Sequence, residues 1–155
     1  MEVDIKIQGV DVIKDVLAHL PPAMRKKALR PSMKSAMKIV QKAASNNIKS
    51  VTSGDSTGKL ERSLRVYSLK TKRGVLRTAV MVQRGLVYPN RFYRGAPLRV
   101  GMIGGILEYG TDKQPPRSWI RKAARESVGA VYIALEEQIR KRLDKALAAS
   151  KSRQL

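Results

Sequence analysis

The sequence predicts an α+β fold in which a small antiparallel sheet packs against long amphipathic helices, including a long C-terminal helix. Apolar residues recur at helical spacing in two long stretches, residues 23–48 and 118–149. Between them, two short runs that are predicted to be strands, residues 64–69 and 75–82, flank a basic turn that ends in glycine. We expect a single domain over residues 1–149 and a frayed basic tail over residues 150–155.

The first predicted element is a half-buried strand, because apolar and polar side chains alternate over residues 3–7. A helix is expected over residues 10–20, with the only histidine, His19, near its end. The N-terminus lacks the basic start and apolar run of a signal peptide. No stretch approaches the roughly 20 apolar residues that a membrane span needs. We therefore expect a soluble protein, made in the cytoplasm, with no membrane partner.

The second helix is expected over residues 23–48, with Pro22 at its start and either a kink or a junction of two helices at Pro31. A row of cations at four-residue spacing starts beside its apolar stripe and winds to the opposite face. No acidic residue interrupts the row, so the repulsion within it is unrelieved. It is either a solvated face or a contact surface for a polyanion or an acidic partner. The basic row consists of Lys26, Arg30, Lys34, Lys38 and Lys42.

After a polar loop, Thr57 is expected to cap a short helix over residues 58–63. Residues 64–69 and 75–82 are predicted to form a hairpin. A strand is expected over residues 98–101, followed by a short helical turn that ends near Tyr109. Gly110 permits a sharp change of direction before the final helix.

Residues 85–97 hold three of the seven aromatic side chains, interleaved with arginine. Because Gly, Pro and Asn break any strand ladder, we expect an irregular, mobile loop. Its aromatics either tuck back onto the domain or, as we favour, form an exposed arm that becomes ordered on a partner. The interface residues of this arm are Tyr88, Arg91, Phe92, Tyr93 and Arg94.

The sequence does not indicate an enzyme, a cofactor or a metal site. With no cysteine and one histidine, a transition-metal site is not expected. The carboxylates are too scattered for an acid–base pair. Residues 54–59 fail as a phosphate-binding loop, because the glycines are one residue too close and Leu60 replaces the required hydroxyl. Glu108 is expected to form a structural ion pair with an arginine rather than to act in catalysis.

Three short motifs occur in order: Thr-Gly-x-Leu-x-x-Ser-Leu, then Leu-Glu-Tyr-Gly-Thr, then Pro-x-x-Trp-Ile-Arg-Lys-Ala. With the predicted strand, helices and hairpin, this order resembles the small neck proteins of long-tailed bacteriophages, the head–tail joining or tail-completion proteins of the lambdoid type. The resemblance covers most of residues 1–149. It departs from the family at Trp119, where Phe is usual, and over residues 85–97. The matching residues are Thr57, Gly58, Leu60, Ser63, Leu64, Glu108, Tyr109, Gly110, Thr111, Trp119, Ile120 and Ala123.

The resemblance implies an α+β fold and a homo-oligomeric ring, usually sixfold, at the junction of capsid portal and tail. It implies that the partners are connector or head-closure rings and tail-terminator rings. It also implies that the protein is made in the host cytoplasm and becomes part of the virion, and it brings no catalytic residues. The formal net charge of +20 then faces either genomic DNA in the channel or acidic faces of neighbouring rings.

Two other classes of protein compete with this interpretation. The net charge and the basic row also fit a free-standing basic nucleic-acid-binding protein, although no recognised nucleic-acid-reading motif is present. A toxin-like or regulatory protein with an acidic antagonist is the third class.

Overall fold

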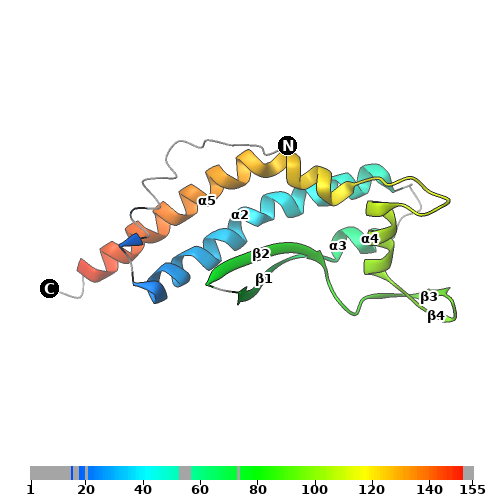
Figure 1. The fold of residues 1–155 in the computed structure, drawn as a ribbon, viewed down its shortest axis with the longest axis horizontal. Coiled ribbons are helices and arrows are strands. Elements are labelled where there is room, and N and C mark those ends of the chain that lie inside the picture. Colours follow the sequence, from blue (N-terminus) through cyan, green and yellow to red (C-terminus); the bar gives the residue numbers. More distant parts are fainter. Residues whose placement is uncertain (1–14, 16–17, 20, 53–56, 73, 152–155) are drawn as a thin grey trace.

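The computed structural model describes residues 15, 18–19, 21–52, 57–72 and 74–151, with side chains up to residue 145. The fold class is α+β, as the sequence predicts: long helices pack against small antiparallel sheets (Figure 1). The strand expected over residues 3–7 and most of the helix expected over residues 10–20 lie outside the described residues, as do residues 152–155 of the expected tail.

Helix α2 (Pro22–Val51) is the central element. It starts directly after Pro21, with Pro22 in its first turn, where a missing backbone N–H costs nothing. It continues through Pro31 as one helix, so the alternative of two separate helices is wrong. Its buried residues recur every four positions and face the interior. They are Ser32, Ala36, Val40, Ala44 and Ile48.

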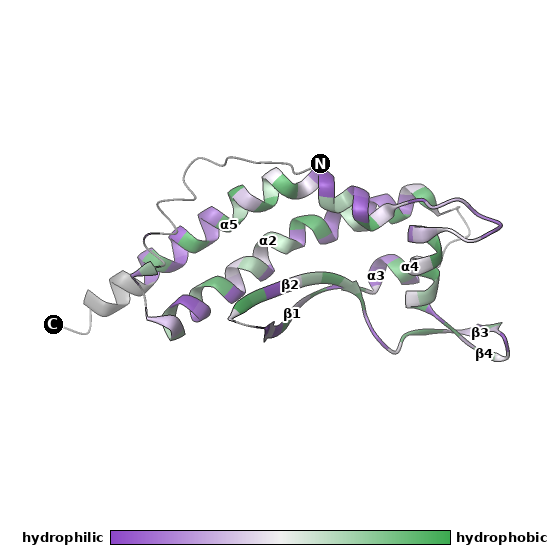
Figure 2. Ribbon diagram, viewed as in Figure 1, coloured by the Kyte–Doolittle hydropathy of each residue, from purple (hydrophilic) through white to green (hydrophobic). Residues whose placement is uncertain are grey.

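Helix α5 (Trp119–Lys151) confirms the predicted C-terminal helix and runs antiparallel to α2 along much of its length (Figure 1). Hydrophobic and hydrophilic residues alternate along both long helices, as expected of helices covered on one side (Figure 2). Within the described part of the chain, no helix is long and apolar enough to cross a membrane.

Strands β1 (Leu64–Lys72) and β2 (Val75–Val82) form the predicted hairpin and lie along α2 on the side away from α5 (Figure 1). The antiparallel register pairs Leu64 with Val82, and a bulge follows Leu69. Gln41 of α2 donates a hydrogen bond from Nε2 to the Leu64 carbonyl at 2.8 Å, which ties the helix to the start of the hairpin. Helix α2 therefore lies between α5 and the sheet.

Strands β3 (Val87–Tyr93) and β4 (Ala96–Arg99) form a second hairpin, so the irregular loop expected over residues 85–97 is wrong. Arg94 and Gly95, with φ of 48° and 76°, supply the left-handed turn that a tight hairpin requires. The ladder is interrupted between Tyr88 and Phe92, which is where Pro89 lies. Pro89 and Asn90 thus fall at an irregularity, Pro97 lies within the ladder opposite Phe92, and the hairpin still forms.

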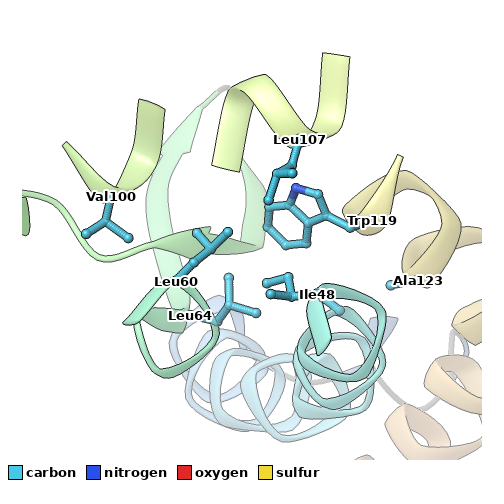
Figure 3. Packing of buried hydrophobic residues seen from close by; sticks show 8 residues of the cluster. Ile48, Leu60, Leu64, Val100, Leu107, Trp119 and Ala123 are labelled. Atoms are coloured by element: carbon cyan, nitrogen blue, oxygen red, sulfur yellow. The ribbon is translucent and has the colours of Figure 1, made fainter. Parts of the chain in front are cut away.

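Two short helices complete one end of the molecule: α3 (Lys59–Arg62) and α4 (Val100–Tyr109). Helix α4 is longer than the helical turn expected there, and the strand expected over residues 98–101 ends at Arg99. Between these helices, the end of α2 and the start of α5 lies the buried core (Figure 3). The core consists of Ala44, Ile48, Leu60, Leu64, Val100, Leu107, Trp119 and Ala123.

Candidate functional site

The second motif forms the junction between α4 and α5. Glu108 is only 2% exposed, and its carboxylate accepts the backbone N–H groups of Ile120 at 2.8 Å and Arg121 at 3.3 Å. These donors belong to the first turn of α5, which has no intrahelical partner for them. Arg121 Nε lies 2.6 Å from Glu108 Oε1, which confirms the predicted ion pair. Glu108 therefore acts as the N-terminal cap of α5.

Arg121 extends this junction to the molecular surface. Its Nη2 donates to the backbone carbonyl of Glu108 at 3.1 Å and to Ser118 Oγ at 3.2 Å. Its guanidinium also lies 5.2 Å from the centre of the Tyr109 ring, within cation–π range. Tyr109 remains 71% exposed. The exposed side chains of the second motif are therefore Tyr109, which pairs with Arg121, and Thr111.

Gly110 makes the turn between the two helices, with φ of 77°. A Cβ at this position would lie 2.6 Å from the carbonyl oxygen of Gln114 and 2.8 Å from the nitrogen of Pro116. Both obstructing atoms belong to the backbone, which cannot rotate away. Thr111 pairs with Gln114 across the turn, with N–H to O at 2.8 Å. The expected sharp turn at Gly110 is confirmed.

Trp119 of the third motif connects α5 to α4 and α2. Its ring Nε1 donates to the Gly104 carbonyl at 2.9 Å, and its own carbonyl accepts from Asn47 Nδ2 at 3.1 Å. A Cβ at Gly104 would lie 3.2 Å from Leu60 Cδ1 and 3.5 Å from the Trp119 ring. The absence of a side chain at Gly104 is thus what lets the indole and the leucine close over α4.

The first motif lies at the start of α3. The prediction that Thr57 caps this helix is wrong: Gly58, with φ of 62°, occupies the N-cap position, and no side chain bonds there. A glycine in the left-handed region turns the chain into the helix without a capping side chain. Ser63 is buried and donates from Oγ to the Leu60 carbonyl at 2.6 Å. Thr57 itself is exposed.

The three motifs, which are far apart in the sequence, meet in one cluster (Figure 3). Leu60 and Leu64 come from the first motif, Leu107 from the second, and Trp119 and Ala123 from the third. Among the residues that match the family, most therefore hold the fold together, and the exposed exceptions are Thr57, Tyr109 and Thr111.

The basic row divides into two kinds of side chain. Arg30 is half-buried, and its Nη2 donates to Thr71 Oγ1 of β1 at 3.0 Å. The four lysines are exposed, and no carboxylate of the described residues forms an ion pair with any member of the row. Lys34, Lys38 and Lys42 each follow a buried residue by two positions, about 200° around the helix. They therefore point away from the core.

The predicted interface arm corresponds to the β3–β4 hairpin and also divides in two. Tyr88 is half-buried against the core, with Lys59 Nζ 5.5 Å and Arg91 5.9 Å from its ring centre. At the tip, Phe92 is 66% and Tyr93 48% exposed. Arg94 lies 5.5 Å from the Tyr93 ring centre. One aromatic thus anchors the hairpin, and the other two face outward.

An apolar groove of about 320 Å³ lies between α2 and α5, and sequence reasoning did not identify it. Helix α2 contributes Met33, Met37 and Val40, and α5 contributes Val128, Tyr132 and Leu135. Thr78 of β2 lines the same groove. Periodicity assigned these apolar residues to a covered stripe. The sequence feature that could have indicated the groove is the uncharged run over residues 127–135. A helix that is covered on one face only usually carries charged residues on its other faces, and this run has none.

No group of three or more His, Asp or Glu side chains comes together to hold a metal ion in the part of the chain that the structure describes. His19 is exposed, with Nδ1 2.6 Å from the Asp15 carbonyl oxygen. Comparison of the chain with protein-family models, with curated proteins and with solved structures gives no match.

Proposed function

We propose that this chain is a structural virion protein without catalytic activity. In this proposal it forms a homo-oligomeric ring at the neck of a long-tailed bacteriophage, completes the tail and joins it to the head connector. The proposal rests on the three ordered motifs that resemble the lambdoid-type neck proteins. Its main support is that residues of all three motifs pack in one cluster, as expected if they are parts of one inherited fold.

Two exposed features support a role in assembly. The tip of the β3–β4 hairpin presents aromatic and arginine side chains, the residue types most enriched at binding hot spots. The exposed lysines of the basic row carry charge that no carboxylate of the described residues neutralises. A ring around a DNA channel, or one stacked on an acidic ring, uses such charge, and either contact weakens as salt rises.

The deciding experiment is to locate the protein in particles of the phage that encodes it. Image reconstruction of intact virions should place a closed ring of this subunit, six copies being the usual expectation, between the connector and the tail terminator. Deleting the gene should leave DNA-filled heads and separate tails, and supplying the protein in trans should join them. Virions with no copy of this chain at the neck contradict the proposal.

The basic row also favours a second candidate, a free-standing nucleic-acid-binding protein. This candidate predicts that the purified chain binds duplex DNA with a steep salt dependence, in which log K falls by about 0.9 per phosphate contact for each unit of log salt concentration. It also predicts that virions lack the protein. Finding the protein at the neck, together with weak binding to free DNA, excludes this candidate.

A further inference from the structure

The groove between α2 and α5 is an apolar surface without a cover among the described residues. Thioether and aliphatic side chains line it, and Tyr132 at its edge is exposed. The neighbouring Ile133 is exposed as well. Soluble proteins rarely leave contiguous apolar surface open, and such surface usually marks a contact with another molecule.

The α5 wall of the groove also differs from the rest of this basic protein in its charge. Residues 127–135 carry no charged side chain. The carboxylates on either side of this run include Glu126, which pairs with Lys122 at 4.0 Å, and Glu136, which pairs with Arg140 at 2.8 Å. Helix α2, by contrast, contains no acidic residue. A basic partner segment therefore meets less repulsion along this wall of α5 than along the exposed row of α2.

The β3–β4 hairpin has the complementary properties. Residues 84–99 contain four arginines and no carboxylate, and the tip carries the exposed rings of Phe92 and Tyr93. Aromatic rings make favourable contacts with methionine sulfur, which Met33 and Met37 offer in the groove. The hairpin tip thus matches the groove in its apolar chemistry, and its arginines meet no like charge along residues 127–135.

The hairpin extends away from α2 and α5 at one end of the molecule, so it points away from the groove of its own chain (Figure 1). A contact between the two surfaces therefore joins different copies. Because the hairpin and the groove are different patches, this contact is head-to-tail, and repeating it builds a ring when the rotation between copies closes.

We propose that Phe92 and Tyr93 of one copy occupy the α2–α5 groove of the next copy. This inference rests on the proposed ring and names the contact between its subunits. The uncharged run of α5 is then covered, and the arginines of the hairpin meet no cation along it.

Cysteine cross-linking tests the contact directly, because the chain has no cysteine of its own. Protein with Arg91→Cys, which keeps both rings, is mixed at high concentration with protein carrying Ala124→Cys in the groove, and a short bis-maleimide is added. The matched control replaces Ala124→Cys with Lys38→Cys on the opposite, exposed face of α2. We expect cross-linked dimers with Ala124→Cys and few with Lys38→Cys.

Phe92→Ala and Tyr93→Ala can be added to the Arg91→Cys protein. The association constant between this protein and the Ala124→Cys protein should then fall on the order of tenfold or more, the loss that truncated hot spots give. Protein carrying both Arg91→Cys and Ala124→Cys should give a ladder that ends at the size of the closed ring. Equal yields of cross-linked dimer with Ala124→Cys and Lys38→Cys overturn the proposal. Absence of cross-linked dimer from both the concentrated protein and the particles also overturns it. A cross-link within one chain between Ile5→Cys and Ala124→Cys also overturns it, because the chain then covers its own groove.

The same variants separate this inference from the proposed function. A neck ring whose Arg91→Cys and Ala124→Cys positions do not cross-link overturns the groove contact and leaves the neck assignment intact. Cross-linking in purified protein, with no copy of the chain at the neck of virions, overturns the neck assignment and leaves the groove contact intact.

Discussion

The α4–α5 junction and the tip of the β3–β4 hairpin each pair a tyrosine with an arginine, at 5.2 Å and 5.5 Å from ring centre to guanidinium. Their surroundings differ. At the junction, Arg121 also bonds a buried carboxylate and a backbone carbonyl, so the pair is part of the fold. At the hairpin tip, Arg94 and Tyr93 are exposed and form part of a turn. The same two residue types thus stabilise the fold in one region and remain available for contact in the other.

This difference predicts where substitutions act. A change at the junction disturbs the start of a 33-residue helix and the core beside it, so it should reduce stability. A change at the hairpin tip removes side chains outside the buried core, which are 66% and 48% exposed, so it should reduce association and leave stability nearly unchanged.

Gly110→Ala should have the largest effect on stability. Its Cβ would lie 2.6 Å from a backbone oxygen, and its φ of 77° is unfavourable for any other residue. We expect the free energy of unfolding to fall by about 3 kcal/mol or more, from combined strain and overpacking. The matched control is Gly105→Ala in α4, where a Cβ meets nothing within 4 Å and should stabilise the helix by up to about 1 kcal/mol. Urea unfolding measures both, and changes of the same sign contradict the prediction.

Glu108→Gln should have the next largest effect. The amide keeps the shape of the carboxylate but loses the charge that accepts two backbone N–H groups and pairs with Arg121. We expect a loss of about 2 kcal/mol, typical of hydrogen bonds to a charged group. The control is Glu126→Gln, whose ion pair with Lys122 is exposed and 4.0 Å long, and which should change stability by less than about 1 kcal/mol. An equal loss of unfolding free energy for the two variants would show that Glu108 does not cap α5.

The sequence predicted the two long helices and the β1–β2 hairpin because hydrophobic periodicity is a local property. The left-handed turn at Gly110 was also expected, but the prediction failed at two other left-handed positions. Gly58 displaced Thr57 from the capping position, and the turn at Arg94 and Gly95 formed a hairpin where a loop was expected. An arginine at positive φ is uncommon, and no periodicity indicates it.

The α4–α5 junction and the groove were only partly predictable, because they depend on contacts between distant parts of the chain. Only a short helical turn was expected before Tyr109. Trp119 and Leu60 pack over Gly104 of α4, and this contact joins distant parts of the chain. Likewise, periodicity identifies which helix residues are apolar but not which of them a neighbouring element covers. The groove at Met33 and Val128 therefore became visible only once α2, α5 and β2 were placed together.

Lys34→Gln, Lys38→Gln and Lys42→Gln together should leave stability nearly unchanged, because exposed charges contribute little to it. They should lower the yield of joined heads and tails. If the row contacts DNA, the slope of log K against log salt concentration should also flatten by up to about 3. The matched control removes the same charge at exposed lysines outside α2, with Lys70→Gln, Lys72→Gln and Lys113→Gln. Normal particle yield from the α2 variant at both low and high salt would make the row a solvated face.

The smallest effect on stability is expected at the hairpin tip. Phe92→Ala with Tyr93→Ala should leave the urea midpoint within error of the parent, because both rings are largely exposed. Tyr88→Ala in the same hairpin should cost about 2 kcal/mol, because that ring is half-buried against the core. Hydrogen exchange adds the second half of the comparison: amides near the tip should exchange quickly in the isolated chain and slowly in the assembled ring. If the tip variant is as destabilised as Tyr88→Ala, or if exchange is equally slow in both states, the tip belongs to the fold of its own chain and the contrast with the α4–α5 junction disappears.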